Sequence, residues 1–229
     1  MHGSQAKVAG DSGPHAGQPV LSGGPSPEKA DVALILLHGR GASAEGMLSL
    51  YEVLSMPNVA AIVPQAAGNS WYPHSFLVPL KDNQPYLDSA LATVDGLVSD
   101  LLARGIPSNR IALLGFSQGA CLTTEFVARH PRRYGAVIGF TGGLIGPAGT
   151  PRNYAGSLAG TPVFLGSSDP DPHVPFERVK ETEAVLSRMG ASVELRRFGG
   201  MPHTINEEEL EAARTLLRLI AAPAAGDKA

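Results

Sequence analysis

Residues 111–121 read Ile-Ala-Leu-Leu-Gly-Phe-Ser-Gln-Gly-Ala-Cys (IALLGFSQGAC). The aliphatic start predicts a buried strand, and the small residues at the end predict the first turn of a helix. Ser117 stands between Gly115 and Gly119 at the junction, in a G-x-S-x-G pattern. A turn this sharp strains the serine backbone, tolerates only small neighbours and lifts the hydroxyl clear of the sheet. The free N–H groups of the helix then face any anion that forms there. We therefore predict that Ser117 is a nucleophile; the alternative is a glycine-rich turn with an incidental serine.

The rest of the chain alternates aliphatic runs with amphipathic segments, which predicts an α/β fold with a mostly parallel sheet between helices. Helices are expected over 87–101, ended by Gly105, and over 179–189, ended by Gly190. A last helix begins at Asn206, with Glu209 completing a capping box. The expected strands are an edge strand at 18–21 and buried runs at 32–37, 59–63, 111–114, 136–140, 162–165 and 193–198. In such sheets, reactive groups gather at the C-terminal ends of the strands.

A serine nucleophile needs a histidine base and an acid that orients it, in the chain order serine, acid, histidine. His203 follows the last expected strand in a glycine-containing loop, so we predict that it is the base rather than an exposed bystander. Asp169 and Asp171 both follow the strand at 162–165. Position alone leaves both open as the acid.

The turn after the first long strand, His38-Gly39-Arg40-Gly41, has the composition of a turn that donates a backbone N–H to an oxyanion. The expected donors are the amides of Arg40 and Gln118. We expect His38 to form structural hydrogen bonds rather than to act in catalysis.

The composition excludes several classes. The 229 residues are 43% apolar, enough for one sizeable domain, and carry a net charge of −3. Both signs are interspersed, so no nucleic-acid footprint is expected. No apolar run is long enough to span a membrane, and we expect a soluble cytoplasmic protein. Residues 1–17 are expected to be a disordered leader, 18–221 one domain, and 222–229 a frayed tail. Cys121 is the only cysteine, so no internal disulfide is possible.

With these residues together, the chain resembles the phospholipase/carboxylesterase family of α/β-hydrolases, which includes small bacterial carboxylesterases and acyl-protein thioesterases. The resemblance covers about residues 18–220 and rests on six motifs: LLHGRGAS (36–43), NSWYP (69–73), LLGFSQGA (113–120), FTGGLIG (140–146), DPHVP (171–175) and GMPHTI (200–205). It implies an α/β-hydrolase fold with no metal, no organic cofactor and no large lid domain.

The resemblance also favours Asp171 as the acid. Aligned without a gap from Pro162, the family pattern places its acid at Asp171, whereas Asp169 requires a two-residue insertion. The chain departs from the family at Ser167 and Ser168, where relatives usually carry histidine and glycine. It departs again at Arg40, where many have an apolar residue. The Arg40 side chain is expected either to meet a polar or anionic part of a substrate or to turn to solvent.

The resemblance places Trp71 and Tyr72 beside the substrate pocket, although an aromatic pair is more often part of a core. Met47, Leu144 and Ile145 are weaker candidates for its apolar wall. Cys121 is expected to be a small packing residue, and His173 stays unassigned.

The sequence as a whole therefore predicts a serine carboxylesterase that cleaves small esters of short to medium acyl chain through an acyl-enzyme. Thioester hydrolysis is the nearest alternative. The same residues serve an acyltransferase, and a non-catalytic ligand receptor is a further alternative. We expect no nucleic-acid partner and no membrane insertion. Both a monomer and a homodimer are compatible with the family.

Overall fold

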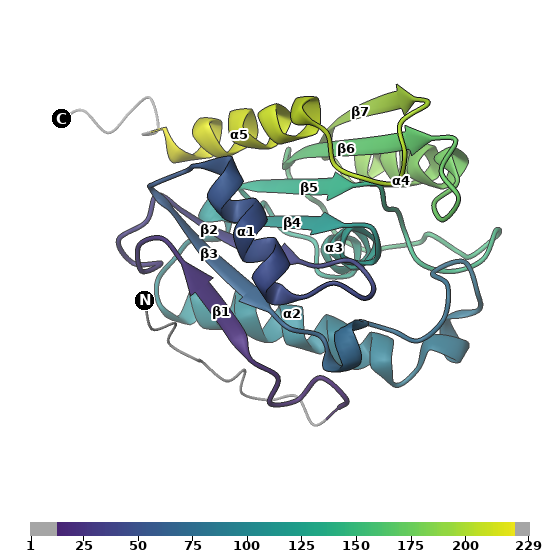
Figure 1. Ribbon diagram of the computed structural model, residues 1–229, viewed down its shortest axis with the longest axis horizontal. Helices are drawn as coiled ribbons and strands as arrows, with labels where there is room; N and C mark the ends of the chain where they lie inside the picture. The colour runs from purple at the N-terminus through teal and green to yellow at the C-terminus, as the bar shows by residue number, and fades with distance from the viewer. Residues whose placement is uncertain (1–12, 223–229) are drawn as a thin grey trace.

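Within residues 13–222, which are the residues that the computed structural model describes, the aliphatic runs form a seven-stranded sheet (Figure 1). Its strand order is β1-β3-β2-β4-β5-β6-β7. β1 pairs antiparallel with β3 at one edge, and all the other pairings are parallel. The strands are β1 (Val20–Gly23), β2 (Val32–Leu37), β3 (Val59–Pro64), β4 (Ile111–Phe116), β5 (Ala136–Phe140), β6 (Pro162–Asp169) and β7 (Ser192–Gly199).

Helices cover both faces of the sheet, because successive side chains of a strand point to opposite faces. In β2, Leu34 and Leu36 belong to the buried cluster that includes residues of α1 and α5, whereas Ile35 and Leu37 belong to the cluster that includes residues of α2, α3 and α4. The α-helices are α1 (Ala44–Leu54), α2 (Tyr86–Ala103), α3 (Gln118–Arg129), α4 (Phe176–Arg188) and α5 (Glu207–Ala221). Short 3-10 turns lie at Ala67–Asn69, Leu80–Asn83 and Ser108–Arg110. No helix of the described residues has the length and apolar content needed to cross a bilayer.

The predicted α/β architecture is confirmed, and the differences lie at the ends and edges of the sheet. β6 continues four residues beyond the predicted end, to Asp169. β1 begins two residues later than expected, at Val20. β7 was expected to be buried on both faces, but it forms the far edge of the sheet and leaves much of its length exposed. The charged residues Glu194, Arg196 and Arg197 within this strand were a usable signal, since a strand covered on both faces has a nearly continuous apolar sequence.

The register of the sheet brings the chain motifs to a common edge. Leu37 pairs opposite Gly115, and Phe116 pairs opposite Phe140. The residues that follow β2, β4 and β5 therefore leave the sheet side by side at its C-terminal end. Reactive side chains collect at this end in open parallel sheets.

The N-terminal segment differs from the prediction. Residues 1–12 and 223–229 lie outside the described residues, but residues 13–17 form a turn against the domain and are not a disordered leader. His15 is buried there and contacts the Trp71 ring. Its Nδ1 accepts a hydrogen bond from the Ala67 N–H at 3.0 Å, and its Nε2 lies 2.9 Å from the Trp71 carbonyl oxygen. The segment has few apolar residues, so its composition did not indicate that the His15 side chain anchors it to the domain.

The predicted capping box at the start of α5 is present and contains a buried acid. The Asn206 side chain accepts from the Glu209 N–H, and Glu209 Oε2 accepts from the Asn206 N–H at 3.0 Å. Glu209 Oε1 has no hydrogen-bond partner among the described residues and lies against the backbone of Gly166 in β6. Burial raises the pKa of Glu209 to about 7, although the hydrogen bond from Asn206 acts in the opposite direction.

This pKa makes fold stability depend on pH. Between its usual value of 4.5 and about 7, folded Glu209 holds a proton that the unfolded chain releases, so stability falls as pH rises through that window. Glu209→Gln keeps a residue suited to the capping box and removes the titration. We expect this variant to be more stable than the wild type above pH 7, by about 3 kcal/mol. Urea unfolding measured from pH 4.5 to 8 checks this. Glu208→Gln, at an exposed position of the same turn, is the charge-matched control, and equal pH profiles for both variants would contradict the assignment.

Candidate active site

Ser117 occupies a strained turn between β4 and α3. Its backbone has φ 53° and ψ −117°, a region that residues with a side chain rarely adopt. A Cβ at Gly115 would overlap the Gly119 backbone, and a Cβ at Gly119 would overlap the Leu37 carbonyl group. Both glycines are therefore required by close backbone contacts, and the turn raises the Ser117 side chain above the end of the sheet.

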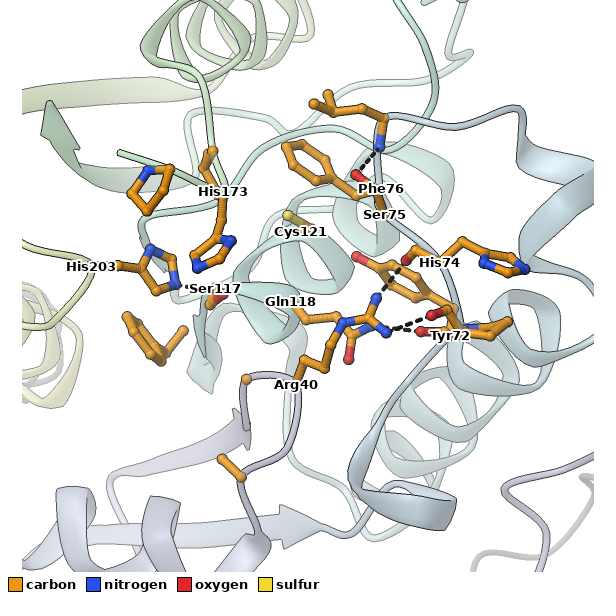
Figure 2. A pocket seen from close by; sticks show the side chains of 17 residues that line it. Arg40, Tyr72, His74, Ser75, Phe76, Ser117, Gln118, Cys121, His173 and His203 are labelled. Carbon is orange, nitrogen blue, oxygen red and sulfur yellow. Dashed lines mark hydrogen bonds between the residues drawn. The ribbon is translucent and has the colours of Figure 1, made fainter. Parts of the chain in front are cut away.

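The structure brings the three predicted residues Ser117, His203 and Asp171 together in a chain of hydrogen bonds, of which Figure 2 shows Ser117 and His203. His203 Nε2 lies 2.8 Å from Ser117 Oγ. His203 Nδ1 lies 2.6 Å from Asp171 Oδ2. An Nδ1–H that donates to the carboxylate leaves Nε2 as an acceptor for the serine proton. This is the arrangement that activates a serine hydroxyl.

Asp171 is positioned by its own loop. Its Oδ1 accepts hydrogen bonds from the backbone N–H groups of His173 and Val174, each at 2.8 Å. Burial acts to raise the pKa of Asp171, but the hydrogen bonds from His203 and from these two amides outweigh it and hold the pKa below its usual value. The carboxylate is therefore charged and fixed toward His203.

The other candidate acid does not face His203. Asp169 is the last residue of β6 and forms an ion pair with Arg197 of the neighbouring strand β7. The hydrogen bond to His203 comes from Asp171, two residues further along. Counting from the strand end could not separate the two aspartates because β6 extends four residues beyond its aliphatic core.

The turn after β2 lies beside the start of α3. His38 is fully buried, its Nε2 accepts from the Ala66 N–H at 3.1 Å, and its Nδ1 lies 2.7 Å from the Gly39 carbonyl oxygen. Burial lowers the pKa of His38, which favours the neutral ring. His38 thus has the structural role expected of it. The backbone N–H groups of Arg40 and Gln118 have no acceptor among the residues the structure describes, which leaves both available to an oxyanion.

Side chains of these same two residues fasten the segment 70–74 over the site. Gln118 accepts from the Trp71 N–H at 2.9 Å and donates to the Tyr72 carbonyl at 2.8 Å. The Arg40 guanidinium donates to the carbonyl oxygens of Pro73 and His74 at 2.6 and 2.5 Å. Arg40 therefore does more than meet substrate or solvent, because it holds the loop that forms one wall of the site.

A cavity of about 660 Å³ lies above Ser117. Tyr72, Phe76, Leu77, Phe116 and Val174 contribute apolar surface to it, and Arg40, His74, His173 and His203 contribute polar groups. In Figure 2, His173 and His203 lie on one side of Ser117, and Arg40 and Tyr72 lie on the other. A cleft of this size and mixed lining suits a small organic ester.

Of the expected pocket residues, only Tyr72 lines the cavity. Trp71 is fully buried beneath it and donates its indole N–H to the His38 carbonyl oxygen at 2.9 Å. Met47 is buried on α1, on the opposite face of the sheet. Leu144 and Ile145 are buried on the same face as α3 and α4, in the connection between β5 and β6. The expectation that these four residues form the pocket wall was wrong.

Buried charges explain the positions of Leu144 and Ile145. Arg178 donates to the Leu144 carbonyl at 2.8 Å, and Glu125 accepts from the Ile145 N–H at 3.0 Å. Arg152 donates to the Ile145 carbonyl at 2.6 Å. The connection is tied down as a short loop and leaves the cavity without a lid domain in this segment.

Sequence reasoning missed Phe116 and Phe76 and left His173 unassigned. Phe116 stands next to the nucleophile within the G-x-S-x-G motif, which was a usable signal; its ring lies 5.1 Å from that of His203. The His173 ring lies edge-on to His203 at 5.0 Å. Phe76 belongs to an irregular segment with no periodic pattern, so nothing in the sequence indicated its position. No cluster of potential metal ligands occurs in residues 13–222.

Comparison with known proteins identifies the family of the chain. Residues 24–221 match the phospholipase/carboxylesterase family. The chain belongs to this family. It is an α/β-hydrolase of the carboxylesterase and thioesterase type, and family membership confirms the expected enzyme class, a carboxylic ester hydrolase.

Individual relatives agree with the family. The structure of a phospholipase/carboxylesterase from Dyadobacter fermentans is 43% identical, with a TM-score of 0.86 over 91% of this chain and 100% of that one. A protein named probable carboxylesterase from Oryza sativa subsp. japonica is 28% identical over 70% of this chain, and the match spans 60% of its own length. Acyl-protein thioesterase 1 from Cryptococcus neoformans is 27% identical over 84% of this chain and 94% of its own.

Cys121 lines the floor of the cavity but is 1% exposed. Burial raises the pKa of its thiol to about 12, so the reactive thiolate is scarce at neutral pH. We expect iodoacetamide to alkylate the native protein about a hundredfold or more slowly than the urea-unfolded protein. Because this is the only cysteine in the sequence, intact-mass spectrometry measures the reaction directly. Rapid alkylation of the folded protein would show an accessible thiolate and contradict the packing role.

Proposed function

We propose that the protein hydrolyses small carboxylic esters through an acyl-enzyme on Ser117, with His203 as general base and acid and Asp171 as its orienting carboxylate. The observation that carries the proposal is the continuous path from Ser117 Oγ through both His203 nitrogens to Asp171 Oδ2, with spacings of 2.8 and 2.6 Å. Family membership supports the ester-hydrolase class.

In acylation, His203 Nε2 takes the proton of Ser117 as its Oγ attacks the ester carbonyl carbon. The carbonyl oxygen becomes an oxyanion, to which the amides of Arg40 and Gln118 donate. Asp171 supports the imidazolium, since its charge is fixed beside Nδ1. The tetrahedral intermediate collapses, the alkoxide leaves, and His203 returns the proton to it to give the free alcohol.

In deacylation, a water molecule takes the place of the alcohol. His203 removes one of its protons while the hydroxide attacks the acyl carbon. The bond to Ser117 Oγ breaks, and the proton goes back to the serine. One ester and one water have then become one acid and one alcohol, with the enzyme unchanged.

The cavity favours short to medium acyl chains. Its volume is about 660 Å³, and the lining residues Pro73, His74, Pro172 and His173 are all exposed. Thioester hydrolysis is a second candidate, supported by the match to acyl-protein thioesterase 1 over 84% of this chain. Rates on oxygen and sulfur esters with the same acyl group separate the two activities.

The nucleophile is tested first. We expect wild-type protein mixed with p-nitrophenyl butyrate to release a rapid stoichiometric burst of p-nitrophenol, followed by slower turnover. Ser117→Ala should abolish both phases and stay folded, because the hydroxyl makes no contact on which packing depends. Circular dichroism and thermal unfolding check the fold. Persistent turnover in the purified variant would disprove the assignment.

The two aspartates provide a matched test of the acid. Asp171→Asn should lower kcat by about a thousandfold or more, because an amide cannot hold the imidazolium as the carboxylate does. Asp169→Asn should change kcat by less than about threefold, since it breaks only the ion pair with Arg197 near the surface. The reverse order of effects would identify Asp169 as the acid.

A further inference from the structure

The cavity above Ser117 is lined by one permanent cation and no carboxylate. Arg40 is the only Lys or Arg among the lining residues within the described chain, and no Asp or Glu lines the cavity with it. Three histidines, His74, His173 and His203, also line the cavity. Asp171 is the nearest acid on the path to Ser117, but its side chain is fully buried behind His203 and engaged by it. A protein with a net charge of −3 thus places an arginine, and no carboxylate, among the residues that line this cavity.

Arg40 also lacks a counter-ion. Several arginines elsewhere in the described chain pair with acids, as Arg178 and Arg152 both do with Glu181. Arg40 forms no ion pair with any described residue. Its hydrogen bonds go to neutral oxygens, and its guanidinium lies over the Tyr72 ring at 6.0 Å. Its charge is held in place but not neutralised.

The unused part of the guanidinium has the geometry that a carboxylate needs. Nη1 and Nη2 donate to the carbonyl oxygens of Pro73 and His74, and Nη1 also approaches Ser70 Oγ at 3.3 Å. The Nε–H and one Nη2–H have no acceptor among the described residues. Two neighbouring N–H groups on one edge of a guanidinium pair with both oxygens of a carboxylate. The loop bonds fix the side chain in advance, so little side-chain entropy is lost on binding.

The catalytic arrangement decides which part of the substrate meets Arg40. His203 returns its proton to the leaving alcohol, so the alcohol lies toward His203. The acyl group then extends away from it. Arg40 and Tyr72 lie on the opposite side of Ser117 from His203 (Figure 2). The cation therefore faces the acyl side of the scissile bond.

We propose that the preferred substrates are half-esters of dicarboxylic acids, whose free acyl-side carboxylate binds the Arg40 guanidinium. This inference rests on the proposed ester hydrolysis at Ser117 and adds the chemical class of the acyl group. Arg40 thus has two roles toward substrate. Its amide donates to the oxyanion, and its side chain selects the acyl group.

The test compares two substrates that differ in charge and little else. Mono-p-nitrophenyl glutarate carries the free carboxylate, and methyl p-nitrophenyl glutarate has the same chain with the carboxylate masked. The ratio of their kcat/KM values measures selectivity independently of overall rate. We expect wild type to prefer the anionic ester by about tenfold or more, which is the contribution of a hydrogen bond to a charged group.

Variants then assign the preference. Arg40→Gln should reduce the ratio to near one, even if loosening the 70–74 loop lowers both rates. Arg40→Lys keeps the positive charge but lacks the two neighbouring N–H groups that bind a carboxylate bidentately, so it should give an intermediate ratio. Arg188→Gln makes the same charge change at an exposed position near the end of α4, outside the cavity lining, and should leave the wild-type ratio.

Three results would overturn the proposal. One is a wild-type ratio near or below one, and another is a ratio that Arg40→Gln leaves intact. The third is a stronger preference for 4-carboxyphenyl butyrate, which carries its carboxylate on the alcohol side. Calorimetric titration of Ser117→Ala with mono-p-nitrophenyl glutarate separates this proposal from the proposed hydrolysis. Binding that depends on Arg40 supports the anion site even if no ester is turned over, and turnover of neutral esters alone leaves hydrolysis standing while this inference fails.

Discussion

A backbone-to-backbone contact between the start of α3 and the turn after β2 is the constraint on which the site depends. Gly119 approaches the carbonyl groups of Leu37 and His38 so closely that no side chain fits between them. The contact brings the first turn of α3 against the end of β2 and the start of the turn that contains Arg40. It also forces Ser117 into its strained conformation at the head of the helix. One steric condition thus sets the position of the nucleophile and of both expected oxyanion donors.

The site also requires that residues 70–74, which form the wall opposite His203, keep one conformation although they form no helix or strand. Side chains fix it from several directions. Gln118 and Arg40 bind the backbone of residues 71–74 from the catalytic side. Trp71 binds the His38 carbonyl from beneath. Most of these bonds join a side chain to a main chain, so the loop needs no secondary structure of its own to be rigid.

The sequence was sufficient where the chemistry and the chain order are local. The elbow at Ser117, the alternation of strands and helices, and the Asn206 capping box all follow from short patterns, and His203 was predicted as the base from its place after the last strand. The sequence was insufficient where the role of a residue depends on how deeply its side chain is buried. Trp71 and Tyr72 are neighbours with similar side chains, yet one lies beneath the cavity and the other lines it. Leu144 and Met47 are apolar, which fits a core as well as a pocket wall. Leu144 is held in the core by a hydrogen bond from buried Arg178, and Met47 lies on α1 on the opposite face of the sheet. Arg40 was noticed as a departure, but its bonds to Pro73 and His74 span more than 30 residues that have no pattern in common.

The anchoring of His15 has a practical consequence for anyone who engineers this enzyme. Residues 13–17 resemble the sort of polar, glycine-containing extension that is routinely trimmed to improve expression or crystallisation. His15 nevertheless contacts both Ala67 and Trp71, and Trp71 directly precedes Tyr72 of the cavity lining. A protein that begins at residue 18 would therefore lack the His15 contacts that support the segment leading to residues 70–74. The effect would emerge as altered turnover in a protein that still folds, and it would be mistaken for a property of the active-site residues themselves.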